Sequence, residues 1–219
     1  MARPEHADEI AAATDAFRAG DPVLIHDAAD REGEVDLVYP AEAVTPDALA
    51  RLRNDAGGLV CVALSDAVAR AFALPFAREI IDHPAADNGE LAYGDQSSFS
   101  LAVNHRETYT GITDDDRSKT ITELGRAAAD PVKFDFAAAF RAPGHVHLLR
   151  GAPDLLDERR GHTEFALALA AAAERQPAVV VCEMLDDGGG ALAPADARAY
   201  ADCNGYVYVE GSDLFDHLG

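Results

Sequence analysis

The chain has 219 residues, 48% of them hydrophobic, which is enough for one large domain with a buried core. Its 39 acidic and 18 basic residues give a net charge of -21, and such a surface repels nucleic acid and anionic membranes, so neither is an expected partner. This balance predicts a cytosolic protein of a salt-loving organism, in which salt screens the repulsion between like charges, with an ordinary acidic enzyme as the alternative.

Hydrophobic periodicity and helix-end residues divide the first third of the chain into alternating elements. In chain order we expect a helix at 9–19, strands at 23–25 and 37–39, a helix at 45–55, a strand at 59–64 and a short helix at 66–73. Thr45 suits an N-cap, and Pro46 suits the first helical position after it. The run 59–64 is apolar without a break, which predicts a central strand covered on both faces.

A long loop with several prolines and glycines is expected between Pro75 and Ser97. After it we expect a strand at 99–103, a helix at 114–129, a helical or irregular segment at 134–140, a strand in the second half of 143–151, a helix at 165–174, a strand at 179–182, a helix at 194–204 and a strand at 206–209. The two strands between 23 and 39 suit an antiparallel pair. The sequence therefore predicts an α+β (mixed α/β) fold with three α/β/α layers and a mixed twisted sheet, as a single domain over residues 1–219.

Three cysteines, Cys61, Cys182 and Cys203, are far apart and form no CxxC pair, so neither a disulfide framework nor a structural zinc site is expected. Cys61 and Cys182 lie in apolar runs, where cysteine usually acts as a small buried hydrophobic residue. No apolar segment has the length of a signal peptide or a membrane span, so we expect a cytoplasmic protein.

The most informative stretch is residues 30–36, Asp-Arg-Glu-Gly-Glu-Val-Asp, directly after an apolar strand. If it is extended, alternation places Glu32, Glu34 and Asp36 on one side. Hard cations such as Mg2+ prefer carboxylate oxygens, and Arg31 could hold a phosphate or carboxylate group of the same substrate. The alternative is a solvated acidic turn.

Three further groups stand at predicted strand ends or loops, where ligands collect in open sheets: His145, the run 159–163 and Glu183. The run precedes an alanine-rich helix whose N-terminus favours an anion, so it is the best phosphate site in the sequence. Carboxylates, imidazoles and arginines around a metal would suit proton abstraction beside the carbonyl of a phosphorylated sugar. A surface histidine and ordinary surface arginines are the alternatives, and Glu183 is the hardest of these residues to explain structurally because burying a lone carboxylate is unfavourable.

Five motifs occur together and in order: residues 30–36, Thr110-Gly111-Ile112, Pro143-Gly144-His145, residues 159–164 and Val181-Cys182-Glu183. With them the chain resembles the 3,4-dihydroxy-2-butanone 4-phosphate synthase family of riboflavin biosynthesis, from near the N-terminus to the last strand. Asn104-His105-Arg106 and the short acidic stretch are more similar to the archaeal members. The resemblance implies conversion of D-ribulose 5-phosphate to 3,4-dihydroxy-2-butanone 4-phosphate with release of formate. It also implies a homodimer with Mg2+ or Mn2+, two ions per active site, and no organic cofactor.

The resemblance also implies roles for individual residues. Glu32 and His162 correspond to metal ligands, and His145 and Glu183 correspond to the catalytic residues that move protons. The implied substrate contacts are Arg31, Glu32, Asp36, Arg159, Arg160, Gly161, His162, Thr163 and Glu183. Further candidates are Glu34 in the acidic stretch, Thr110 at the phosphate and Cys61, whose position matches one near the substrate although burial explains it equally well.

Two other functions remain open. The carbamoyl-adenylate-forming tRNA-modification family is similar in fold, but it would need ATP and a basic surface for nucleic acid, which this composition lacks. A non-enzymatic metal- or metabolite-binding protein would keep the pocket without turnover. No zinc-binding GTP cyclohydrolase domain follows within the 219 residues, so a single activity is expected, and residues 80–96 match the family motifs poorly.

Overall fold

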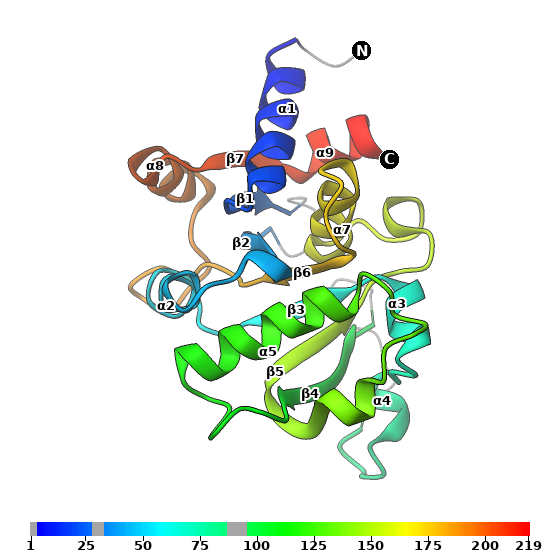
Figure 1. The fold of residues 1–219 in the computed structure, drawn as a ribbon. Coiled ribbons are helices and arrows are strands. Elements are labelled where there is room, and N and C mark those ends of the chain that lie inside the picture. Colours follow the sequence, from blue (N-terminus) through cyan, green and yellow to red (C-terminus); the bar gives the residue numbers. More distant parts are fainter. Residues whose placement is uncertain (1–3, 28–32, 87–95) are drawn as a thin grey trace.

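A computed structural model describes residues 4–27, 33–86 and 96–219 (Figure 1). Its strands form one seven-stranded mixed sheet in the order β4-β5-β3-β6-β2-β1-β7. The strands are β1 (Val23–His26), β2 (Val35–Pro40), β3 (Cys61–Leu64), β4 (Phe99–His105), β5 (Phe140–Arg150), β6 (Ala178–Val181) and β7 (Val207–Glu210).

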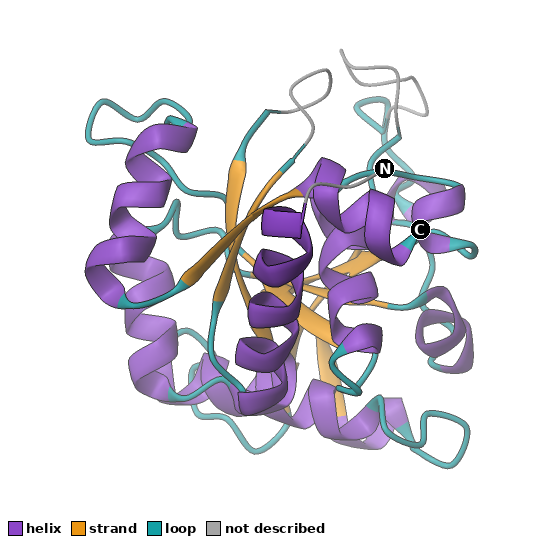
Figure 2. Cartoon of the chain, turned by 90° about the horizontal axis from the view of Figure 1, so that it is seen from above, coloured by secondary structure: helices purple, strands orange, loops and turns teal. Residues whose placement is uncertain are grey.

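Helices lie on both sides of this sheet (Figures 1 and 2). They are α1 (Pro4–Ala19), α2 (Pro46–Asp55), α3 (Asp66–Ala71), α4 (Ala77–Ile80), α5 (Asp114–Ala127), α6 (Phe136–Ala139), α7 (His162–Ala172), α8 (Pro194–Asn204) and α9 (Gly211–Leu218), with 3-10 turns η1 (Ala41–Ala43) and η2 (Leu155–Asp157). In the described part of the chain, no helix combines the length and apolarity needed to cross a membrane.

Two hydrophobic cores separate the layers. One packs α1, α7 and α9 against one face of the sheet, around Phe17, Phe165 and Leu214. The other packs α2, α3, α5 and α8 against the opposite face, around Leu49 and Ile121. Because both faces are covered, all four residues of β3 and all six of β2 are buried. The predicted three-layer arrangement with a mixed sheet is confirmed.

Strand pairing also follows the sequence pattern. β1 and β2 are antiparallel, as expected, with Val23 opposite Val38. β3 is central, parallel to β5 and antiparallel to β6. Thr45 caps α2 as predicted, because its side chain accepts a hydrogen bond from the Ala48 amide at 3.1 Å.

Several local features differ from the sequence expectations, and one is that α1 begins at Pro4 instead of at residue 9. The short helix α4 lies inside the expected loop, and α9 follows the strand that was expected to be the last element. α7 begins at His162 rather than at Phe165. This start is not visible in the sequence, because the N-cap residue is Gly161, which has no side chain to mark it. β5 begins at Phe140 instead of in the second half of 143–151.

The pairing of β4 with β5 is interrupted where a predicted catalytic residue lies. Val103 pairs with Val146, but the next residue, Asn104, pairs with Arg141. The four residues between the two partners, 142–145, therefore form an irregular bulge in β5. Bulges turn side chains away from the regular alternation of a strand. His145 is consequently exposed, although it belongs to a strand between two others.

Candidate active site

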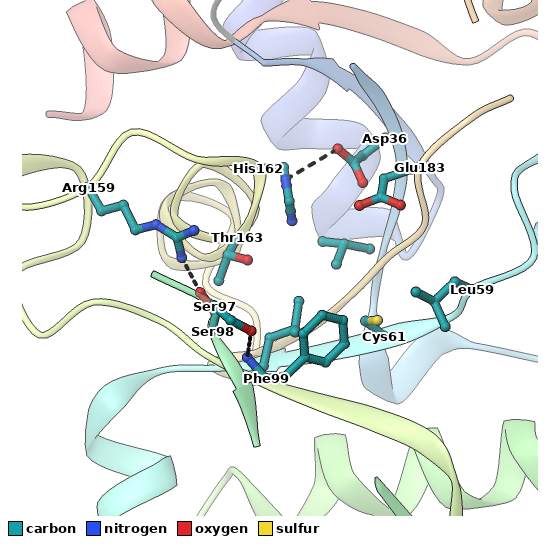
Figure 3. Close-up of a pocket in the computed structure, with 12 residues that line it drawn as sticks. Asp36, Leu59, Cys61, Ser97, Ser98, Phe99, Arg159, His162, Thr163 and Glu183 are labelled. Atoms are coloured by element: carbon teal, nitrogen blue, oxygen red, sulfur yellow. Dashed lines mark hydrogen bonds and ion pairs between the residues drawn. The ribbon is translucent and has the colours of Figure 1, made fainter. Parts of the chain in front are cut away.

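A pocket opens on the α7 face of the sheet (Figure 3). Its empty volume is about 540 Å3, including the part open to solvent, which is within the range of small-ligand sites. Its walls are formed by Asp36, Leu59, Cys61, Ser97, Ser98, Phe99, Leu149, Arg159, His162, Thr163, Val181 and Glu183.

Two carboxylates face each other across this pocket because of strand alternation. Asp36 shares a face of β2 with Val38, and Glu183 follows Val181 by two residues, and both valines pack in the core below α7. Asp36 and Glu183 are directly opposite in an antiparallel bridge, a pairing that brings Cβ atoms to within about 4.5–5.5 Å. Asp36 is fully buried and Glu183 is half-buried. Like charges placed directly opposite repel each other, so this arrangement favours a cation between them.

His162 extends from the first turn of α7 towards the same carboxylates (Figure 3). Its Nδ1 lies 3.9 Å from Asp36 Oδ2. Thr163, the next residue, is buried and lines the pocket. The N-cap residue of α7, Gly161, has no side chain that could accept hydrogen bonds from the first amide groups of the helix. This helix end therefore suits an anion.

Arg159 forms the opposite wall and is anchored behind it. Its guanidinium donates a hydrogen bond to Ser98 Oγ, and its Nη1 lies 3.7 Å from Glu164 Oε1. The same Glu164 oxygen accepts a hydrogen bond from the Ala152 amide at 3.0 Å. Glu164 is fully buried, and burial raises the pKa of its carboxyl group, although nearby Arg159 opposes this shift. Glu164 therefore links Arg159 and the segment after β5 to α7.

Cys61 forms part of the pocket floor, opposite Val181 on β6. Its side chain is 5% exposed, and burial, with the nearby charge of Glu183, raises the pKa of the thiol far above neutral pH. This shift disfavours the reactive thiolate, and the buried side chain forms part of the pocket floor.

His145 and Thr110 belong to a second group of residues that does not line this pocket. The His145 amide donates to Asn104 Oδ1 at 2.8 Å, and the His145 ring Nδ1 lies 3.1 Å from the Asn104 side-chain nitrogen. His145 is four residues from Leu149, which does line the pocket, and four residues of strand span about 13 Å.

The loop that carries Thr110 is fixed beside Asn104. Asp116 accepts hydrogen bonds from the amides of residues 109, 110 and 111, and these bonds, that of Gly111 first, lower the pKa of its carboxyl group. A Cβ atom at Gly111 would lie 2.0 Å from Asn104 Nδ2, so the loop touches the residue that holds His145. Thr110, Asn104 and His145 thus form one cluster.

The other predicted residues lie elsewhere. Arg160 is exposed, with its guanidinium 3.6 Å from the centre of the Phe215 ring on α9. Glu34 is half-buried and does not line the pocket. The predictions for Arg31 and Glu32 concern residues outside the described part of the chain.

The donor types of the pocket suit a hard cation. Asp36, Glu183 and His162 supply carboxylate oxygens and an imidazole nitrogen, which bind Mg2+ and Mn2+. Within residues 4–27, 33–86 and 96–219, no three His, Cys, Asp or Glu side chains gather closely enough to hold a metal ion by themselves. Mg2+ is usually held by one or two carboxylates, and water and substrate oxygens complete its coordination.

Sequence reasoning did not identify several residues of these two groups. Ser97, Ser98 and Phe99 reach the pocket from the start of β4, and no motif marks them. Glu164 belongs to the motif 159–164, but nothing in the sequence indicates its contact with Arg159. Asn104 belongs to the triplet Asn104-His105-Arg106, and its contact with His145 depends on the bulge in β5.

Comparisons with known proteins match this sequence and this fold. A family model for 3,4-dihydroxy-2-butanone 4-phosphate synthase matches residues 11–217. A protein of that name from Archaeoglobus fulgidus is 44% identical, over 92% of this chain and 90% of the relative. Another from Methanosarcina mazei is 42% identical, over 95% of this chain and 90% of the relative. A crystal structure of a 3,4-dihydroxy-2-butanone 4-phosphate synthase in complex with two magnesium ions has a TM-score of 0.81 and 29% identity, over 95% of each chain.

Proposed function

We propose that this chain, which belongs to the 3,4-dihydroxy-2-butanone 4-phosphate synthase family, carries out the family reaction in the pocket of Asp36, His162 and Glu183. The enzyme converts D-ribulose 5-phosphate to 3,4-dihydroxy-2-butanone 4-phosphate and formate in riboflavin biosynthesis, and it depends on a divalent metal. The observation that supports this location is the pair of opposed carboxylates facing an imidazole and an arginine across one cavity.

The phosphate of the substrate binds at the N-terminus of α7. Arg159, the Thr163 hydroxyl and amide groups in the first turn of the helix provide the donors. A guanidinium matches two phosphate oxygens at once, and the helix dipole favours the negative charge. Glu164 keeps the Arg159 guanidinium turned towards Ser98 and the pocket.

The sugar end of the substrate lies between Asp36 and Glu183, beside the residues that would hold the metal. Mg2+ or Mn2+, with two ions per site, would be held by Glu32 and His162, and His162 Nδ1 lies 3.9 Å from Asp36 Oδ2. When bound, the metal supplies positive charge beside the oxygens that become negative during the reaction.

Glu183 moves a proton at the carbon next to the substrate carbonyl. Its carboxylate faces the pocket from the end of β6, and half-burial limits the access of water to it. The reaction requires several proton transfers, for the enediol, the loss of water and the skeletal rearrangement, so a second acid–base group is needed. His145 is the predicted partner of Glu183 in these transfers.

We place His145 in the active site of a second copy of the chain. In one chain, His145 is about four strand residues away from the pocket, exposed, and firmly held by Asn104. Tyr109 and Ile112, which flank Thr110, are 93% and 51% exposed, and apolar side chains of this kind are commonly covered in an interface. A homodimer would bring Thr110 and His145 of each chain to the pocket of the other.

Formate release from D-ribulose 5-phosphate tests the proposed site. Wild type should release formate with Mg2+ or Mn2+ and stop after chelation, and Asp36→Asn should lose most of this activity while it keeps its fold. Full activity of Asp36→Asn would place the reaction elsewhere.

Mixing two inactive variants tests the shared site. His145→Ala and Glu183→Gln should each be inactive, but co-expressed chains should recover about a quarter of the wild-type activity, because half of the dimers are mixed and each mixed dimer has one intact site. If both residues act within one chain, every site of the mixed dimer carries a substitution, and no activity returns.

A further inference from the structure

A second pocket lies on the far side of Arg159, and we call it the Phe76 pocket. It is bounded by α3, α4, the start of β4 and the segment after β5. Its walls are Asp66, Arg70, Phe76, Arg78, Gln96, Ser97, Ser98, Arg150, Gly151, Ala152, Pro153, Glu158 and Arg159. Ser97, Ser98 and Arg159 also line the active-site pocket, so the two pockets meet at these residues.

The charge of the Phe76 pocket is opposite to that of the chain as a whole. Four arginines line it, against the two carboxylates of Asp66 and Glu158, although acidic residues outnumber basic ones by more than two to one in the sequence. A surface of this composition repels anions generally. Glu164 offsets the charge of Arg159 from behind, but the four arginines still outnumber the nearby carboxylates and create a local positive site.

Carboxylates within the pocket neutralise only part of this charge. Asp66 serves two guanidinium groups, because its oxygens lie 2.6 Å from Arg70 Nε and 3.1 Å from Arg150 Nη2. Arg78 donates to the carbonyl oxygen of Ser97, which is a neutral acceptor. A guanidinium has five N–H groups, and this bond uses one of them.

The aromatic ring in the pocket holds two of the cations close together. The guanidinium carbons of Arg78 and Arg150 lie 4.0 Å and 4.3 Å from the centre of the Phe76 ring. Cation–π contacts fix the orientation of both groups. Arg150 donates to the Leu74 carbonyl at 2.8 Å through Nη1 and to Asp66 at 3.1 Å through Nη2, and each of these nitrogens carries a second N–H group. An anion that accepts from these groups and from Arg78 lowers the repulsion between the two guanidinium groups. With the ring occupied in this way, the pocket suits a compact oxyanion rather than a stacked base.

We propose that the Phe76 pocket binds inorganic phosphate, at a site separate from the one that holds the phosphate group of the substrate. The bound phosphate contacts Arg78, Arg150 and Arg70. It lies on the side of Arg159 that faces away from the active-site pocket. Because Arg159 lines both pockets, the phosphate weakens the attraction of this guanidinium for the substrate. This consequence rests on the proposed function, whereas phosphate binding itself does not.

Equilibrium dialysis with labelled inorganic phosphate tests the proposal, at a fixed KCl concentration and without divalent metal. Wild type should bind two phosphates per chain, one in each pocket. Arg78→Gln should bind one, because glutamine keeps an N–H donor for the Ser97 carbonyl but removes the charge. Arg70→Gln, which alters an exposed side chain of the same pocket, should retain two sites, with the affinity of one reduced about 3- to 10-fold. The matched control is Arg126→Gln, since Arg126 pairs with Glu123 on α5, and it should bind as wild type does.

Two further readouts make the result decisive. Thermal unfolding must show that the variants are folded, and the KM of Arg78→Gln for D-ribulose 5-phosphate, measured without added phosphate, should equal that of wild type. Equal numbers of bound phosphates in wild type and Arg78→Gln would overturn the proposal. One phosphate in wild type and none in Arg78→Gln would support the Phe76 pocket and count instead against phosphate binding at the α7 N-terminus. A raised KM in Arg78→Gln would also overturn it, because the pocket would then belong to the substrate site. Formate release by wild type tests the proposed function separately.

Discussion

Glu164 provides the sharpest test of how the active-site wall is built. Its carboxylate is fully buried, lies 3.7 Å from Arg159 Nη1 and accepts the Ala152 amide at 3.0 Å. At an effective dielectric constant near 20, the attraction to Arg159 is about 4 kcal/mol, and removing a carboxylate from water opposes it by several kcal/mol. These contributions nearly cancel, so Glu164→Gln, which keeps an acceptor for Ala152, should change the free energy of unfolding by about 1–2 kcal/mol or less at neutral pH. Glu164→Leu leaves that buried amide without its acceptor and should cost about 1–3 kcal/mol more.

The pH dependence of stability gives this prediction a sign. Burial raises the pKa of Glu164 in the folded chain above its ordinary value of 4.5. Between these two pKa values, the folded chain keeps a proton that the unfolded chain has released, so the contribution of Glu164 to stability falls as pH rises through this interval and is constant above it. The stability of Glu164→Gln minus that of wild type should therefore increase with pH from about 4.5 upwards, by at most about 1.4 kcal/mol per pH unit, and then level off.

Urea unfolding across this pH range, in concentrated KCl, measures the difference. The KM for D-ribulose 5-phosphate should rise more than kcat falls in Glu164→Gln, since Arg159 loses its anchor. A stability difference that does not change with pH, together with an unchanged KM, would refute the assigned role of Glu164.

Three other predictions concern the rest of the chain. Gly111→Ala should lower the free energy of unfolding by about 1–3 kcal/mol and also reduce kcat, because Gly111 has a φ of +86° and a Cβ atom there would collide with Asn104, which holds His145. Urea unfolding and formate release measure the two effects. Wild-type values in both assays would contradict this packing. Iodoacetamide should label only the exposed Cys203 in the folded chain, since Cys61 and Cys182 are buried and burial raises the pKa of the Cys182 thiol to about 12. Labelling of Cys61 would instead show that the pocket floor is reactive. The melting temperature should rise steeply with KCl, because the Debye length shrinks from about 10 Å at 0.1 M to about 3 Å at 1 M, and an unfolding temperature indifferent to salt would argue against the charge reasoning.

Local signals were sufficient for most of the fold. The apolar run 59–64 corresponds to β3, and the Thr45-Pro46 pair marks the start of α2. The resemblance to archaeal family members is confirmed by the relatives from Archaeoglobus fulgidus and Methanosarcina mazei. The start of α7 could not be predicted from capping residues, because Gly161 leaves no side-chain signal at the N-cap. α9 was missed for the same reason, since the side chain of Glu210 does not cap it.

Several residues of the pocket could be named from the sequence, but their arrangement could not be predicted. Asp36 and Glu183 are 147 positions apart, and only the antiparallel bridge between them makes them neighbours. His145 leaves the regular alternation of β5 through a bulge whose register depends on the partner strand. Arg160 lies beside the recognised Arg159, yet its guanidinium lies over Phe215 because consecutive side chains point in different directions. Such long-range pairing cannot be read from spacing alone.

The most direct measurement of the central claim compares substrate binding and formate release in Glu183→Gln. This variant keeps the size and hydrogen-bonding groups of the side chain but cannot act as a base at neutral pH. We predict that it binds D-ribulose 5-phosphate in calorimetry with an affinity close to that of wild type and releases no formate in the presence of Mg2+. Formate release at the wild-type rate would contradict the claim that the pocket between β2, β6 and α7 performs the chemistry.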